Sequence, residues 1–303
     1  MTYEATDEFG NSMSLPMPSK AEFDSAEDMP ADSFCGVFPL THGCGALTYL
    51  KICGENGEML FYGTVDIQHE TVSGGGSTLD LKCRSLAGLL LDSEPLPSVC
   101  DSPSLPEIFS QHLKPYGFTG FSGSSAIFSG QFCITKGMSE WQAAALFCST
   151  FLNAEPRVHG TIFDASGNKG NGSILFDNCK GTGYFSAERL DRCCDRITEI
   201  YAPDWAAGCY RLVAQDGEAA RMGILRKRCL APSPQNDQAA IKNSIKKSFV
   251  LHVCCPECPK AGIGDAAALN DSVLGCFGNL EIAGVHCTAG ADGIRTRYSL
   301  RRK

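Results

Sequence analysis

Apolar and polar residues alternate near both ends of the chain, and this alternation predicts strands. Every second residue from 59 to 67 is apolar or small, and the pattern resumes from 79 to 84 beyond the glycine-rich turn SGGGS. A period of two is typical of a hairpin with one buried face. The last strand is the clearest, because three arginines and a serine occupy its second face. The residues expected on its first face are Ile294, Thr296, Tyr298 and Leu300.

Helical signals lie in the middle of the chain. Residues Ser104–Glu107 and Ser139–Gln142 each match a capping box, in which a serine and a residue three positions later satisfy the first backbone groups of a helix. The first helix is expected to stop at Lys114-Pro115. Apolar residues recur at helical spacing from Trp141 to Leu152, and we expect this stripe to pack into a core.

The order of these signals predicts a mainly β protein with an α/β insert. We expect a first β domain over residues 1–100, an insert over 101–185 with two capped helices and a hairpin, and a second β domain over 186–303. The first dozen residues are expected to be loose. Residues 231–244 are polar with no apolar period, so an irregular connection is predicted there.

The charge distribution argues against a protein that grips nucleic acid. The chain has 303 residues and a formal net charge of −8, and its first 34 residues hold eight acidic residues and one lysine. Nucleic-acid binding usually needs a broad basic face, whereas the only basic cluster here is at the C-terminus. The sequence contains no long apolar run and does not begin like a signal peptide, so synthesis in a cytosol-like compartment is expected.

Motifs of catalysis are missing from the sequence. The six histidines never occur as H-E-x-x-H, and neither G-x-S-x-G nor a phosphate-binding G-x-x-x-x-G-K-S/T is present. The sequence therefore indicates neither an enzymatic activity nor a cofactor.

One stretch, VCCPECPKAGIGD (253–265), raises the possibility of thiol chemistry. Cys254, Cys255 and Cys258 supply at most three of the four ligands of a closed zinc site, so Cys276, His286 or Cys287 would have to complete it. A redox C-x-x-C would normally open a helix, yet proline and glycines follow here. The alternation before Cys255 favours a third interpretation, in which these thiols lie at the end of a strand and in the loop that leaves it.

Several of these segments together resemble the phage tail baseplate hub family, which includes late control D-like and Mu-like hub proteins. The segment FYGTVDIQHETVSGGGSTLDLKCRSLAGLLLDSEPLP (61–97) has the G-x-V-D strand and is similar to the family's R-S-x-A-x-L-L-D-x-E motif, which it matches with one additional leucine. SLPEIFSQHLKPYGF (104–118) and ITKGMSEWQAAALFCSTFLNAEPRV (134–158) are similar to its helices. IGDAAALNDSVLGCFGNLEIAGVHCTAGADGIRTRYSL (263–300) is similar to its closing strands.

The resemblance implies two tail-tube-like β-barrel domains joined through a middle helical segment. It implies a homotrimer whose six tube-like domains adapt a sixfold tail tube above to a threefold central spike below, among surrounding baseplate proteins. DNA would pass through the lumen without specific binding, and the protein would be assembled in the bacterial host cytoplasm and reside in the virion tail baseplate. No residue would be catalytic, and the structural residues would be Gly63, Asp66, Trp141, Phe147 and the strand from Ile294 to Leu300.

Two other functions remain open at this point. The first is a metal-binding or thiol protein built on Cys254, Cys255 and Cys258. The second is a cell-wall hydrolase associated with a phage tail.

Overall fold

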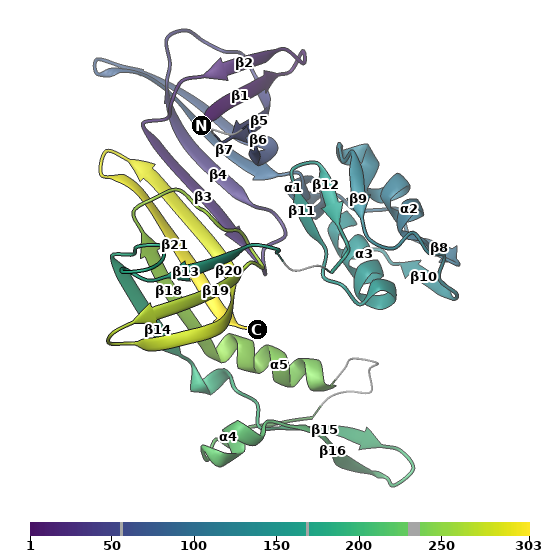
Figure 1. The fold of residues 1–303 in the computed structure, drawn as a ribbon. Coiled ribbons are helices and arrows are strands. Elements are labelled where there is room, and N and C mark those ends of the chain that lie inside the picture. Colours follow the sequence, from purple (N-terminus) through teal and green to yellow (C-terminus); the bar gives the residue numbers. More distant parts are fainter. Residues whose placement is uncertain (55–56, 168–169, 230–236) are drawn as a thin grey trace. The chain divides into compact units, whose positions relative to one another are not determined.

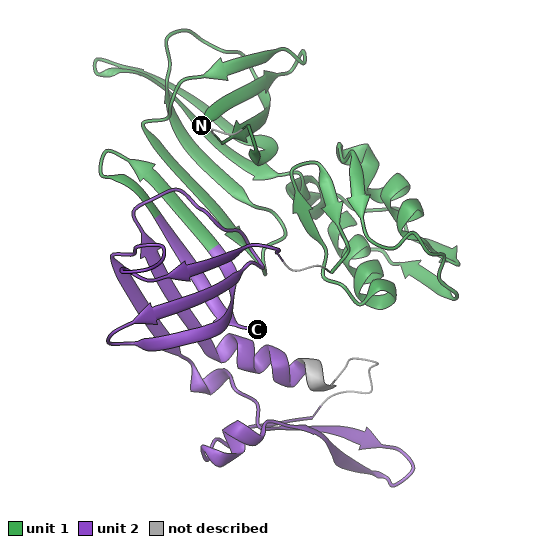
Figure 2. Ribbon diagram, viewed as in Figure 1, with its two compact units in different colours: residues 1–169, 285–295 green, residues 170–284, 296–303 purple. Residues whose placement is uncertain are grey.

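The computed structural model describes residues 1–54, 57–167, 170–229 and 237–303, and strands dominate it (Figure 1). The mainly β class predicted from the sequence is therefore confirmed. The chain forms two compact units (Figure 2). Unit 1 contains residues 1–169 and 285–295, and unit 2 contains residues 170–284 and 296–303. No helix within the described residues is long and apolar enough to cross a membrane.

Unit 1 is built on an antiparallel sheet with the strand order β3-β4-β7-β6-β5-β1-β2. On its other side β3 neighbours β20 (Gly275–Gly290), of which residues 285–290 belong to this unit. The seven strands have these bounds: β1 Thr2–Asp7, β2 Ser12–Leu15, β3 Lys20–Ala26, β4 Ser33–Pro39, β5 Leu47–Cys53, β6 Met59–Ser73 and β7 Gly76–Ser85.

Aromatic rings fill the core beneath this sheet. Buried and half-buried residues alternate along β4, as the period of a one-sided strand requires. The ring centroids of Tyr3 and Phe38 lie 5.5 Å apart, and those of Phe34 and Phe61 lie 5.9 Å apart. The N-terminus, expected to be loose, instead forms β1, because Tyr3 and Ala5 point into this core while β1 pairs with both β2 and β5.

Short helices and strands follow β7 within unit 1. Their bounds are α1 Ala87–Asp92, β8 Ser98–Asp101, α2 Leu105–Ile108, β9 Gly120–Ser122, β10 Gln131–Ile134, α3 Glu140–Phe147, β11 Arg157–His159 and β12 Ile162–Asp164. Both predicted caps form. Ser104 accepts a hydrogen bond from the Glu107 backbone N–H, and Ser139 and Gln142 complete the capping box of α3.

Unit 2 contains a sheet with the order β14-β18-β21-β20, extended by β19 on β20 and by β13 on β19. A separate small sheet has the order β16-β15-β17. The remaining bounds are β13 Ser173–Phe176, β14 Ser186–Asp191, β15 Glu199–Asp204, β16 Cys209–Gln215, α4 Gly217–Arg221, β17 Lys227–Cys229, α5 Asp237–Ser248, β18 Phe249–Cys255, β19 Ala266–Asp271 and β21 Gly293–Arg302.

The connection predicted over residues 231–244 is wrong in its second half. Residues 230–236 lie outside the described part of the chain, but α5 begins at Asp237. Ile241 of this helix is buried against Ile200 and Ala214, and Ile245 packs against the same cluster. Two isoleucines four residues apart therefore provide the apolar contact that stabilises a helix whose other residues are mostly polar.

Gly63 allows β6 and β7 to approach each other closely. A Cβ at position 63 would lie 2.0 Å from the carbonyl oxygen of Arg84 and 2.6 Å from its carbonyl carbon. Backbone atoms in the middle of a sheet cannot move aside as the end of a flexible side chain can, so any larger residue must push the strands apart.

We expect Gly63→Ala to lower the free energy of unfolding by at least about 2 kcal/mol, because the added methyl overlaps the β7 backbone. Urea denaturation followed by circular dichroism measures this change. Gly74→Ala is the matched control, since a Cβ at position 74 meets nothing within 4 Å, and its effect should stay within about 0.5 kcal/mol. Equal losses in the two variants would contradict the steric explanation.

Candidate functional site

Three residues of the 61–97 segment, Asp66, Arg84 and Asp92, meet in an ion triad at one end of the β6–β7 hairpin. The register of the two strands shifts between Val65 and Ile67, so Asp66 lies at a bulge. A bulge redirects the side chain of the extra residue. Asp66 Oδ2 accepts a hydrogen bond of 2.5 Å from Arg84 Nε, while the two terminal nitrogens of Arg84 donate to Asp92 at 2.6 and 3.3 Å.

The electrostatics of this triad favour the charged forms of Arg84 and Asp92. Hydrogen bonds from Arg84 lower the pKa of Asp92, and the bonds to Asp92 and Asp66 raise the pKa of Arg84. Because Asp92 is the last residue of α1, one guanidinium joins the hairpin to the helix that follows it. Asp66, which we predict to shape the hairpin, thus contacts Arg84 on the partner strand.

The next motif residue, Ser85, connects the end of β7 with Asp32, the residue before β4. Ser85 is buried, its backbone N–H donates to the Asp32 carbonyl at 2.9 Å, and its hydroxyl accepts from the Asp32 N–H at 3.1 Å. Burial raises the pKa of the Asp32 carboxyl. The R-S pair is part of a sequence motif, but its local spacing does not predict this contact, because Asp32 lies 53 positions earlier in the chain.

Trp141 and Phe147 lie on α3, as the stripe predicted. Phe147 is fully buried, and its ring centroid lies 5.7 Å from that of Phe132 and 5.3 Å from that of Phe151. Trp141 is half-buried, with its ring 6.1 Å from Phe163. Both side chains therefore pack in the same hydrophobic core, in which Phe147 is buried and Trp141 lies at the margin.

The final strand, β21, buries three of the four residues expected on its first face. Thr296, Tyr298 and Leu300 are almost fully buried, whereas 39% of Ile294 is exposed. The Thr296 hydroxyl donates to the Glu257 carbonyl at 2.5 Å, and the Tyr298 hydroxyl accepts from the Lys260 backbone N–H at 2.8 Å. Two hydroxyl groups of β21 thus form hydrogen bonds with the backbone of the loop that contains the end of the cysteine stretch.

The cysteine stretch begins on β18 and continues into this loop, as the alternation indicated. Cys255 is the last residue of β18 and is fully buried, while Cys254 and Cys258 are half-buried. Burial, with a smaller contribution from the charge of Glu257, raises the pKa of Cys255 to about 11. A thiol with such a pKa is almost entirely protonated at neutral pH and is therefore a poor nucleophile and a poor metal ligand.

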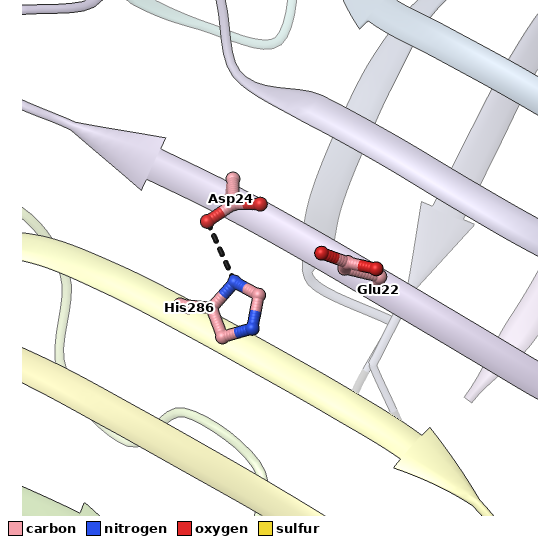
Figure 3. Close-up of side chains that lie close together, drawn as sticks. All are labelled: Glu22, Asp24 and His286. Atoms are coloured by element: carbon pink, nitrogen blue, oxygen red, sulfur yellow. Dashed lines mark hydrogen bonds and ion pairs between the residues drawn. The ribbon is translucent and has the colours of Figure 1, made fainter.

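A different group of potential ligands converges in the described part of unit 1 (Figure 3). Glu22 and Asp24 lie on β3 and His286 lies on β20, all three are half-buried, and each offers a ligand atom within 4.8 Å of the other two. His286 Nδ1 is 2.7 Å from Asp24 Oδ1. Among the described residues this is the one such group of three, and the cysteine stretch does not form another. Sequence reasoning missed it, because 262 positions separate Asp24 from His286.

Large apolar side chains are exposed on several hairpins. The β15–β16 hairpin carries Trp205 at its turn, with Tyr210 and Leu212 on β16, and all three are exposed. Val72 is exposed near the turn of β6–β7, and Val273 near that of β19–β20.

Comparisons with known proteins identify the fold. No protein-family model and no curated protein matches the chain. A tail protein from Neisseria meningitidis MC58 is 16% identical with a TM-score of 0.73, over 100% of this chain and 97% of that one. The 43 kDa tail protein of prophage MuSo2 from Shewanella oneidensis is 14% identical with a TM-score of 0.76, over 99% and 97%.

A third similar structure comes from a secretion system. It is an Escherichia coli component of the type VI secretion system, described as structurally similar to bacteriophage T4 tail proteins. It is 9% identical with a TM-score of 0.60, over 95% of this chain and 74% of that one. The chain therefore has the fold of phage tail proteins, which confirms, at the level of fold, the resemblance found in the sequence.

The triad predicts a specific cost for a conservative change at position 84. We expect Arg84→Lys to lower the free energy of unfolding by about 1 kcal/mol, because a single ammonium cannot reproduce the fork that reaches both Asp66 and Asp92. The same urea titration measures the change. Arg295→Lys on the exposed face of β21 is the control, and a similar loss in both variants would contradict the triad.

The burial of Cys255 predicts slow alkylation in the native protein. With iodoacetamide at pH 7.5, Cys255 should react at least about tenfold more slowly than the exposed Cys209 and Cys229, because its thiol is buried and protonated. Peptide mass spectrometry after timed quenching measures the three rates. In urea the rates should become equal, whereas equal rates in the native protein would restore the thiol-site hypothesis.

Proposed function

We propose that the protein is a structural baseplate hub of a phage tail or of a related tail-like particle. Three copies form a ring that adapts the sixfold tail tube to the threefold central spike, with other baseplate proteins around it. The observation that carries this proposal is the similarity to two tail proteins over nearly the whole length of each chain. The similarity to a secretion-system component is the reason to include particles that carry no genome.

The sheets themselves favour assembly. Strand β2 is at one end of the unit 1 sheet, and β14 is at one end of the unit 2 sheet. Every residue of these two strands is exposed or half-buried. Edge strands offer unpaired backbone groups that a neighbouring chain can cover. The exposed apolar side chains of the β15–β16 hairpin add a second kind of contact surface.

The finer architecture belongs to the same proposal. Two tube-like β-barrel domains, over residues 1–100 and 186–303, flank the α/β insert over 101–185. DNA passes through the ring without specific binding, which suits a chain whose net charge is −8. The protein acts without catalytic turnover, and it is assembled in the host cytoplasm before it becomes part of the tail baseplate.

The mass of the assembled protein tests the trimer. Three chains of 32.4 kDa give about 97 kDa, and we expect this mass by light scattering, either alone or after co-expression with the spike protein of the same particle. Pull-down with the tube and spike proteins is the second measurement. A stable monomer that binds neither partner would overturn the hub proposal.

Incubation with purified peptidoglycan serves as the control for a lytic function. A structural hub leaves the turbidity of the suspension unchanged, whereas release of soluble fragments would show a cell-wall hydrolase instead.

A further inference from the structure

Two carboxylates and an imidazole converge on the face shared by β3 and β20 (Figure 3). We propose that Glu22, Asp24 and His286 bind a divalent transition-metal ion, with Zn²⁺ as the expected occupant. Binding needs no second chain, because all three residues belong to unit 1 of one molecule.

The donor atoms fit this class of ion. One imidazole nitrogen and two carboxylate oxygens form a mixed set that suits borderline ions such as Zn²⁺, and three protein ligands leave one position for water. Calcium is less well suited, since it takes six to eight oxygen ligands and the group contains a nitrogen.

The distances are compatible with this occupant. Bonds of about 2.1 Å place the ligand atoms of a tetrahedral zinc site about 3.4 Å apart. The three ligand atoms here lie within 4.8 Å of one another, and Asp24 Oδ1 is 2.7 Å from His286 Nδ1. Small side-chain rotations would therefore bring all three atoms to bonding distance.

The sheet supplies the preorganisation that a metal site needs. Glu22 and Asp24 are two positions apart on β3, so both side chains lie on the same face of the strand. His286 reaches them from the neighbouring strand β20. An ion bound there would join segments 262 residues apart in the sequence and so oppose separation of β20 from β3.

A nearby thiol does not belong to the expected ligand set. Cys35 on β4 is the cross-strand partner of Glu22, but its sulfur is not among the ligand atoms that lie within 4.8 Å of one another. The expected ligands are therefore oxygen and nitrogen.

Cobalt titration of the purified full-length chain tests the site, because Co²⁺ replaces Zn²⁺ and its absorption spectrum reports its ligands. We expect His286→Ala and Asp24→Asn each to lose one equivalent of bound Co²⁺ that shows no thiolate charge-transfer absorption. Glu22→Gln, which keeps the side-chain shape, should weaken this equivalent by at least about tenfold. In wild-type protein, but not in the two loss variants, Zn²⁺ should raise the melting temperature.

Two control variants separate this site from other metal-binding groups. His69→Ala removes a histidine whose partner is Asp80 on the neighbouring strand, and it should leave the titration unchanged. Cys35→Ser should also leave it unchanged. Equal binding by wild type, His286→Ala and Asp24→Asn would overturn the proposal and reduce the group to an ion pair. Loss of the equivalent in Cys35→Ser would overturn the assigned ligand set.

Discussion

The pairing of β6 and β7 in unit 1 depends on a steric constraint at Gly63. The Arg84 carbonyl occupies the space that a side chain would need, so the two longest strands of this sheet can pair closely only with glycine at that position. The bulge that follows directs Asp66 to Arg84, and Arg84 also reaches Asp92 at the end of α1. The close approach at Gly63, the bulge and the ion triad thus lie next to one another where the hairpin leads into α1.

Local patterns were sufficient for elements whose stabilising contacts repeat along the chain. The alternation before Cys255 predicted β18, and the capping box at Ser139 predicted the start of α3, because each signal lies within the element that it describes. The α5 helix was missed because Ile241 and Ile245 are its main apolar contacts, too few to define a period. The first strand was missed because acidic residues around Tyr3 and Ala5 resemble a solvated terminus.

The contacts of the candidate sites were less predictable than the elements. Asp66, Arg84 and Asp92 were recognisable as motif residues, but their meeting depends on a bulge that sequence alternation does not reveal. The pairing of His286 with Asp24 depends on β20 lying beside β3, which is a property of the strand order rather than of either segment. Sequence spacing finds ligands only when one turn or helix carries them.

The two groups of potential metal ligands differ in burial as well as in residue type. The cysteine stretch has a familiar spacing, yet Cys255 is buried at the end of β18 with its thiol proton retained. Glu22, Asp24 and His286 form no motif, yet their half-buried atoms face one another from two strands, where an ion can still enter from water. In a protein proposed to work by assembly, an ion at that position would stabilise a pair of strands, and stabilisation of this kind requires neither a substrate nor a reactive thiol.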